Sequence, residues 1–222
     1  MSYQIAIDGP AGAGKSTIAK RVAKEKGMIY VDTGAMYRAM AYYLLQKGVR
    51  AEDKESVEQA CEGAQITICY ENGEQVVLLN GENVNGVIRT EEVGQMTSTV
   101  SRYPKIRERL TLLQKELART NNVVMDGRDI GTCVLPDADV KVYLTASVEV
   151  RAGRRYRELM EKGVSCNLEQ IADDIEARDK QDMTREISPL KQAEDAVLVD
   201  SSNMTIEQAS EAILKLCGGE QR

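Results

Sequence analysis

Residues 9–16, GPAGAGKS, have the types and spacing of a loop that binds nucleoside triphosphates. The pattern is G-x-x-x-x-G-K-[ST], and it lies between a short apolar segment and a helical one. Glycines let backbone N–H groups turn toward a phosphate, and the following helix adds its N-terminal dipole. We expect Lys15 to reach the β- and γ-phosphates and Ser16 to offer its hydroxyl to Mg²⁺. An ordinary glycine-rich turn is the alternative, which the flanking elements disfavour.

The composition excludes several classes of chemistry. The 222 residues include no His, Trp or Phe. Without His there is no Ser-His-Asp triad, no Cys-His pair and no imidazole that could bind zinc or act as a base near neutral pH. The five Cys, at positions 61, 69, 133, 166 and 217, form no Cys-x-x-Cys pair. We therefore expect reduced thiols in a cytosolic protein.

The net charge and the hydropathy of the chain limit the classes of partner that the protein can bind. The net charge of −6 disfavours polyanions as partners, so we expect no nucleic acid. No apolar run approaches the ~18 residues of a membrane span, and the N-terminal MSYQIAIDG does not resemble a signal peptide. We expect a cytoplasmic protein with no membrane partner. The acidic surface and the lack of coiled-coil heptads favour a monomer.

Alternating apolar strands and amphipathic helices predict an α/β fold with a parallel sheet. Strands are expected at residues 4–8, 28–32, 122–126, 140–144 and 196–200, and helices at 15–26, 34–47, 104–120, 147–161, 168–183 and 205–217. Four of these strands end in Asp, at positions 8, 32, 126 and 200. Ligands of such sheets bind beyond the carboxyl ends of the strands, so we expect these aspartates to line one rim.

The pattern changes between residues 66 and 88. Two hairpin-turn dipeptides, Asn72-Gly73 and Asn80-Gly81, separate β-rich runs there. This predicts a small antiparallel meander inserted into the α/β chain. We expect a core of residues 1–60 and 99–222 and an inserted acceptor-binding subdomain at 61–98.

Three classes of triphosphate-binding protein compete at this point. A GTPase would need a guanine-reading Asn-Lys-x-Asp, which the chain lacks. An ATPase that remodels nucleic acid is usually larger and has a basic track for its polymer. A small-molecule kinase needs an arginine-rich acceptor site and an arginine-rich cover, because phosphoryl transfer depends on positioning and charge neutralisation. The kinase is favoured if the arginines are placed for those two tasks.

One arginine cluster falls in the helix predicted at 147–161. Arg151, Arg154 and Arg155 have i, i+3, i+4 spacing, and Arg157 follows. Like charges on one helix face repel unless an anion lies among them. This favours a cover over phosphates, and a solvated basic helix end is the alternative.

A second cluster follows in the next helix. Arg178, Asp182 and Arg185 have i, i+4, i+7 spacing if that helix reaches residue 185. A structural salt-bridge ladder would give the same pattern. The position downstream of a phosphate-binding loop favours a substrate site.

The lack of His also bears on the acceptor. A phosphate monoester is largely dianionic near neutral pH and attacks without a general base. A kinase that acts on a hydroxyl would more often use an Asp base, for which Asp8, Asp32 and Asp126 are candidates. The composition leans toward a phosphate acceptor without deciding the question.

Five blocks along the chain have distinctive sequences. They are IAIDGPAGAGKST at 5–17, DTGAMYR at 32–38, IRTEEVG at 88–94, DGRDIGT at 126–132 and ARDKQDMTREISPL at 177–190. Together they resemble the blocks of bacterial cytidylate kinases. The resemblance implies a P-loop kinase with a five-stranded parallel sheet flanked by helices, a small β insert and a helical lid at about 150–165. It implies transfer of the γ-phosphoryl group of ATP to CMP or dCMP, with Mg²⁺. Another P-loop kinase with a different acceptor, such as a different nucleoside monophosphate, stays open as an alternative, and so does a nucleotide-binding protein without catalysis.

The resemblance also implies the roles of individual residues. The ATP site is Gly9, Pro10, Ala11, Gly12, Ala13, Gly14, Lys15, Ser16 and Thr17. The CMP site is Thr33, Tyr37, Arg38, Ser98, Arg107, Arg128, Asp129, Arg178, Asp182 and Arg185. The catalytic group is Lys15, Arg128, Arg154, Arg155 and Arg185. Within the CMP site, Ser98, Arg107 and Asp129 match base-reading positions, and a carboxylate suits the N4 amino group of cytosine.

Overall fold

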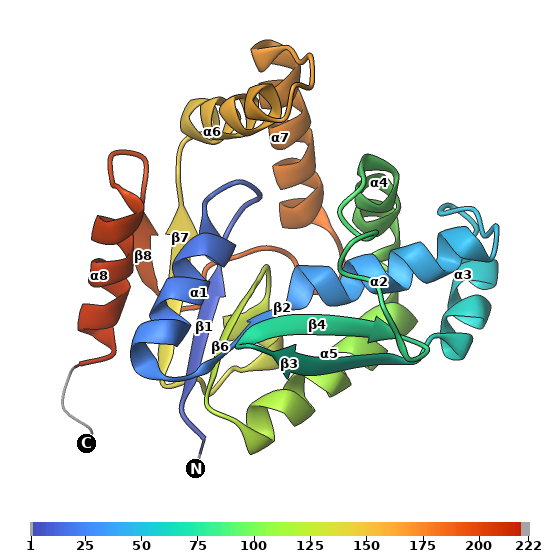
Figure 1. The fold of residues 1–222 in the computed structure, drawn as a ribbon, viewed down its shortest axis with the longest axis horizontal. Coiled ribbons are helices and arrows are strands. Elements are labelled where there is room, and N and C mark those ends of the chain that lie inside the picture. Colours follow the sequence, from blue (N-terminus) through green and yellow to red (C-terminus); the bar gives the residue numbers. More distant parts are fainter. Residues whose placement is uncertain (1, 219–222) are drawn as a thin grey trace.

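The computed structural model describes residues 2–218, which form a five-stranded parallel sheet covered by helices on both faces (Figure 1). The strands are β1 (Gln4–Asp8), β2 (Ile29–Asp32), β6 (Val123–Gly127), β7 (Val140–Thr145) and β8 (Val197–Asp200). Their order is β2-β6-β1-β7-β8, so β1 lies at the centre. The predicted parallel sheet is confirmed, and each strand differs from its predicted range by one residue at most at either end.

The helices follow the predicted periodicity. The main ones are α1 (Lys15–Lys26), α2 (Thr33–Gln46), α5 (Pro104–Thr120), α6 (Val148–Glu161), α7 (Leu168–Thr184) and α8 (Ile206–Leu216). Successive β1 side chains point to opposite faces of the sheet. Ile5 and Ile7 pack into a core with Ile18 and Ile213 of α1 and α8. Ala6 belongs to the other core, which α2 and α5 complete.

The inserted segment forms the predicted antiparallel meander. Its strands are β3 (Ile66–Glu71), β4 (Glu74–Leu79) and β5 (Glu82–Asn83), in the order β3-β4-β5. Asn72 and Asn80 have φ of 52°, and the glycines after them also have positive φ, which suits two-residue hairpin turns. The third strand is shorter than the β-rich run suggested, because the chain turns again after Asn83 and Val87 N–H donates to Val84 C=O.

Two helices in this region were not predicted. They are α3 (Lys54–Ala60), which a short 3₁₀ turn at Cys61–Gly63 follows, and α4 (Glu91–Val100). Each begins at a side-chain cap, Asp53 for α3 and Thr90 for α4. Helix α4 continues past residue 98, where the insert was expected to end, and the division of the chain into a core and an insert stays a prediction.

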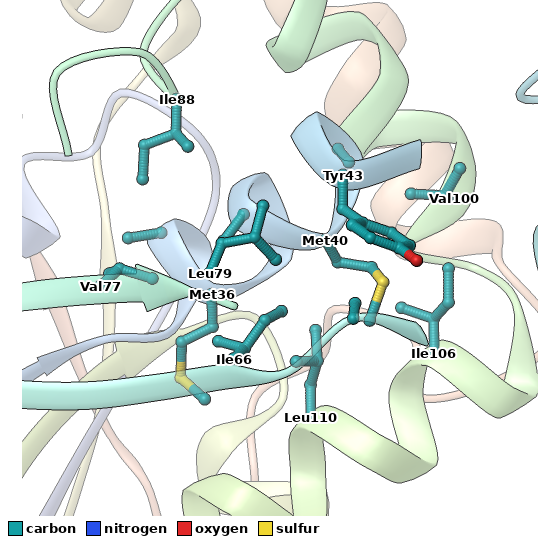
Figure 2. Close-up of a cluster of buried hydrophobic side chains, with 14 of the residues drawn as sticks. Met36, Met40, Tyr43, Ile66, Val77, Leu79, Ile88, Val100, Ile106 and Leu110 are labelled. Carbon is teal, nitrogen blue, oxygen red and sulfur yellow. The ribbon is translucent and has the colours of Figure 1, made fainter. Parts of the chain in front are cut away.

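The insert and α2 share one hydrophobic core. Ile66, Val77 and Leu79 of the small sheet pack in the same cluster as Met36 and Met40 of α2 (Figure 2). Helix α4 packs along α2 as well. Burial of these apolar side chains, at roughly 25 cal/mol per Å², holds the insert against the helix that begins at the end of β2. Within residues 2–218, no helix is long and apolar enough to cross a membrane.

Candidate active site

The phosphate-binding loop connects β1 to α1. Gly9 has a φ of 149°, and a Cβ at this position would lie 1.9 Å from the Leu144 carbonyl oxygen of β7. Gly14 caps α1 with a φ of 89°, in the left-handed region. Both positions therefore require glycine. The tight path of the loop places Lys15 in the first turn of α1.

Lys15 is buried beneath this loop. Its side chain is 5% exposed, and its ammonium donates to the Pro10 carbonyl at 2.7 Å. Burial, and after it the positive charge of Arg128, lower the pKa of Lys15 to about 7, against the opposing effect of Asp126. Arg128 is an expected acceptor-site residue. Its charge acts on the P-loop lysine, so it lies on the side of the acceptor site that faces the P-loop.

Asp126, at the end of β6, faces the loop. Its carboxylate accepts from Ser16 Oγ at 3.1 Å and from the Tyr30 hydroxyl at 2.7 Å. Burial and the neighbouring carboxylate of Asp32 raise the pKa of Asp126 to about 6. Asp32 lies directly across from Asp126 in the β2–β6 register, as expected for strands that end at one rim.

Asp8, at the end of β1, has a structural task. Its two carboxylate oxygens accept from the backbone N–H groups of Ile130 and Gly131, at 2.8 and 2.7 Å. These bonds fold the chain after β6 into a π-helical turn, Ile130–Val134, which was not predicted. Asp8 thus orients the loop that carries Arg128 and Asp129. The fourth predicted rim residue, Asp200, ends the outermost strand, where it is exposed and accepts from Ser202. It is therefore separate from the three buried aspartates, Asp8, Asp32 and Asp126.

Asp129 joins two arginines on the acceptor side. Its carboxylate accepts from Arg107 of α5 at 2.5 Å and from Arg185 at 3.5 Å. Arg107 also donates to the Ser101 carbonyl at 3.0 Å, and its guanidinium lies 5.5 Å from the Tyr37 ring centre. Burial raises the pKa of Tyr37 to about 12. Asp129 and its neighbours thus form one cluster. Its side chains come from α2, from α5, from the segment before the π-turn and from the end of α7.

A second ion pair joins the π-turn to α7. Arg128 Nε donates to Asp182 at 2.9 Å, and Arg185 lies 3.8 Å from the other Asp182 oxygen. Helix α7 ends at Thr184, so Arg185 is its cap residue rather than a helical one. Arg178 is half-buried, and burial together with the charge of Arg128 lowers its pKa. Together, the ion pairs therefore bring Arg107, Arg128 and Arg185 to Asp129 and Asp182.

Arg38 and Thr33 lie at the start of α2. Thr33 Oγ1 donates to the Asp126 carbonyl at 2.7 Å, and Arg38 donates to the Ile88 carbonyl at 3.0 Å. Burial and the charge of Arg89 lower the pKa of Arg38. Arg89, which the sequence reasoning did not single out, donates to Asp32 at 2.6 Å. It lies inside the IRTEEVG block, which was the signal available for it.

The arginines of α6 do not form one cluster. Arg151 is buried, pairs with Asp179 of α7 at 2.6 Å and donates to the Ala11 carbonyl of the P-loop at 3.0 Å. Arg154 donates to the Ser201 carbonyl at 2.8 Å and reaches the Ala13 carbonyl at 3.5 Å. Arg155 forms an exposed pair with Glu158. Each arginine therefore has its own acceptors, which relieves the repulsion expected among them. Arg154 contacts both the P-loop, at Ala13, and the loop that follows β8, at Ser201.

Known proteins resemble this chain over nearly its whole length. The family profile "Cytidylate kinase" matches residues 5–218. A cytidylate kinase from Caldicellulosiruptor saccharolyticus is 49% identical over 96% of this chain and 94% of its own, and one from Bacillus licheniformis is 50% identical with the same coverage. An uncharacterized protein from Eubacterium ventriosum, 12% identical, has the same fold with a TM-score of 0.53 over 99% of this chain and 100% of its own. The chain belongs to the cytidylate kinase family.

Proposed function

We propose that this chain transfers the γ-phosphoryl group of ATP to CMP or dCMP, giving ADP and CDP or dCDP. The family supports this activity, and one structural observation carries it. Asp126 accepts from Ser16 of the P-loop at its carboxylate, at 3.1 Å, and from Thr33 of the acceptor side at its backbone carbonyl, at 2.7 Å. A donor site and an acceptor site therefore face each other across one short space, as in-line phosphoryl transfer requires.

On the donor side, residues 9–17 surround the triphosphate. Backbone N–H groups of the loop and the N-terminus of α1 bind phosphate oxygens, and Lys15 neutralises charge that develops during transfer. Arg154, held at the P-loop and at Ser201, closes the donor site from α6. Arg155, whose guanidinium forms an exposed pair with Glu158, turns toward the phosphates.

On the acceptor side, Arg38, Arg128 and Arg185 bind the monophosphate, and Thr33 fixes the start of α2 beside it. Arg178 and Asp182 bind the sugar. The acceptor is a dianion near neutral pH, so its oxygen attacks the γ-phosphorus without a base. The task of these residues is to hold that oxygen in line and to screen the repulsion between the two substrates.

The base lies against Tyr37, Ser98, Arg107 and Asp129. Asp129 accepts from the N4 amino group of cytosine, and Arg107 donates to N3 and O2. The Arg107 Nε is buried and has no hydrogen-bond partner within residues 2–218. A buried, unpaired donor is costly, and a base acceptor supplies the missing partner. Uracil would place a carbonyl opposite Asp129, which disfavours UMP.

A magnesium site fits beside the P-loop. The Ser16 hydroxyl and the Asp126 carboxylate lie 3.1 Å apart, and oxygen donors of these types are the ligands that Mg²⁺ prefers. When bound with ATP, the ion would neutralise charge on the phosphates. Tyr30 holds the Asp126 carboxylate in place for this task. The monomeric state, the cytoplasmic location and the lack of nucleic-acid partners stay predictions from the sequence.

The test is an ADP-release assay with ATP and a panel of acceptors. CMP and dCMP should be phosphorylated with the highest kcat/KM, UMP less well, and AMP, GMP and small alcohols poorly. Preference for an alcohol acceptor would contradict the proposal, and so would ATP binding without any transfer.

A further inference from the structure

Helix α7 makes one contact that the roles above do not use. The side-chain amide of Gln181 donates to the backbone carbonyl of Ser98 with an N–O distance of 2.6 Å. Ser98 lies in the last turn of α4 (Glu91–Val100). The last four carbonyls of a helix lack backbone partners within the helix and can accept from side chains. Gln181 supplies one such donor to Ser98 from a separate helix.

Gln181 lies on the stripe of α7 that faces the acceptor site. Arg178, Gln181 and Asp182 follow one another in α7 with i, i+3, i+4 spacing. Asp182 pairs with Arg128 across the site. The residue that holds Ser98 is therefore carried by the same helix face as the two residues proposed for the sugar.

The same helix is fixed on the donor side as well. Asp179 pairs with Arg151 at 2.6 Å, and Arg151 donates to the Ala11 carbonyl of the P-loop at 3.0 Å. Gln181, two residues further along α7, reaches α4 instead. Helix α7 thus spans from the P-loop to the acceptor side, and the Gln181 bond is its link to the turn that carries Ser98.

The end of α4 is also bound from α5. Ser101, the cap residue of α4, accepts from Arg107 at 3.0 Å, and its hydroxyl donates to the Ser98 carbonyl at 3.3 Å. Gln181 from α7 and Arg107 from α5 therefore converge on one short stretch of backbone. Loss of either bond would let the base-reading Ser98 shift relative to Asp129.

We propose that Gln181 is a positioning residue for the acceptor nucleotide, which acts by holding the Ser98 backbone against α7. This inference rests on the proposed function, because it assigns Ser98 to the cytidine site. Gln181 acts through Ser98 and not on the phosphates. Its loss should therefore weaken the binding of CMP and leave that of ATP unchanged.

The test compares two variants of the same helix. Gln181→Met keeps the side-chain volume and the helix propensity and removes the donor. Gln170→Met is the matched control, since the side-chain amide of the exposed Gln170 donates to Asp174 of the same helix at 2.9 Å. We expect Gln181→Met to raise the KM for CMP about threefold to tenfold, the range of one neutral hydrogen bond. The kcat and the KM for ATP should stay within about twofold, and Gln170→Met should match the parent chain.

A second variant, Gln181→Glu, keeps the length and places a carboxylate oxygen against the Ser98 carbonyl. It should raise the KM for CMP more than Gln181→Met does. An unchanged KM for CMP in both variants overturns the proposal. So does a parallel rise in both KM values together with a lower melting temperature, because that pattern marks a general structural role. If the parent chain itself does not phosphorylate CMP, the proposed function fails instead.

Discussion

The guanidinium of Arg107 lies 2.5 Å from the carboxylate of Asp129, and both side chains are almost fully buried, 6% and 7% exposed. A buried ion pair of this kind adds little stability in itself, but the loss of one partner leaves an uncompensated charge. Here the pair lies beside Tyr37, where the cytosine base is proposed to bind. Stability and base choice are therefore tied to the same two residues.

Asp129→Ala should lower kcat/KM for CMP at least tenfold, since a lost buried contact costs about 1.4 kcal/mol or more. The loss for UMP should be smaller, because uracil places a carbonyl opposite Asp129 where cytosine places its N4 amino group. The KM for ATP should not change. Melting temperature should fall as well, because Arg107 and Arg185 both lose a partner. Steady-state kinetics with both acceptors, and a melting curve, measure these effects.

A purely structural role for Asp129 makes a different prediction. CMP and UMP activity would then fall in equal proportion along with stability. An unchanged CMP:UMP ratio in the Asp129→Ala variant would remove this residue from base reading. Asp129→Asn is a useful companion, because its amide can donate to the uracil carbonyl and should shift the ratio further toward UMP.

Lys15→Met should reduce kcat by several orders of magnitude, because the P-loop lysine stabilises charge that develops in the transition state. The variant should fold as well as the parent chain. The variant loses the hydrogen bond from Lys15 to the Pro10 carbonyl, but it also loses the cost of burying the lysine charge, so the two effects offset each other. Kinetics and thermal melting check both statements, and near-normal turnover would contradict the kinase mechanism.

ATP binding should take up a proton above neutral pH. The pKa of Lys15 is lowered to about 7 in the free protein, so at pH 8 the amine is mostly neutral. The phosphates raise that pKa again, which draws in up to about one proton per ATP. Calorimetric titrations in buffers of different ionisation enthalpy measure this uptake. Lys15→Met should abolish it, and a buffer-independent heat in the parent chain would contradict the assignment.

Asp126→Asn should stabilise the free protein at pH 8 and impair catalysis. The folded-state pKa of Asp126 is raised to about 6, so the folded chain binds this proton more tightly than the unfolded chain. Stability therefore falls as pH rises from about 4 to 6, and above pH 6 the ionised carboxylate carries its full cost. Asparagine removes that cost, so the melting temperature should rise by a few degrees at pH 8 and hardly change at pH 4.

The same variant tests the magnesium site. Loss of the carboxylate beside Ser16 should raise the Mg²⁺ concentration needed for half-maximal activity. Thermal melting at the two pH values and a Mg²⁺ titration of the activity give the two readouts. An equal drop in melting temperature at both pH values would show that the carboxylate is stabilising, against this prediction.

Local signals in the sequence were sufficient for most of the main sheet and its helices. Helix α5 begins at Pro104, where proline is well suited to the first turn. The hairpin turns at Asn72-Gly73 and Asn80-Gly81 form as predicted. Helix α4 was missed because Gly94 and several Thr and Val residues lower its helix propensity. Its signal was the cap Thr90 followed by two glutamates, and packing against α2 supplies the rest of its stability.

Other features depend on contacts between distant parts of the chain. The π-turn at Ile130–Val134 forms because Asp8, far earlier in the sequence, accepts two of its N–H groups. The buried pairing of Arg151 with Asp179 likewise could not be read from the arginine spacing alone. For the site itself, the resemblance named the residues, and the structure brings Arg107, Arg128, Asp129, Asp182 and Arg185 together.

The central position of β1 has a consequence for how the protein is made. Residues 4–8 leave the ribosome well before their hydrogen-bonding partners, residues 123–127 and 140–143. This apolar strand cannot pair with β6 and β7 until more than half of the chain has been synthesised. Pairing over such sequence distances is slow and leaves the strand open to wrong associations meanwhile. Nascent chains truncated before β6 should therefore bind chaperones through their N-terminal strand, and chains that extend past β7 should release them.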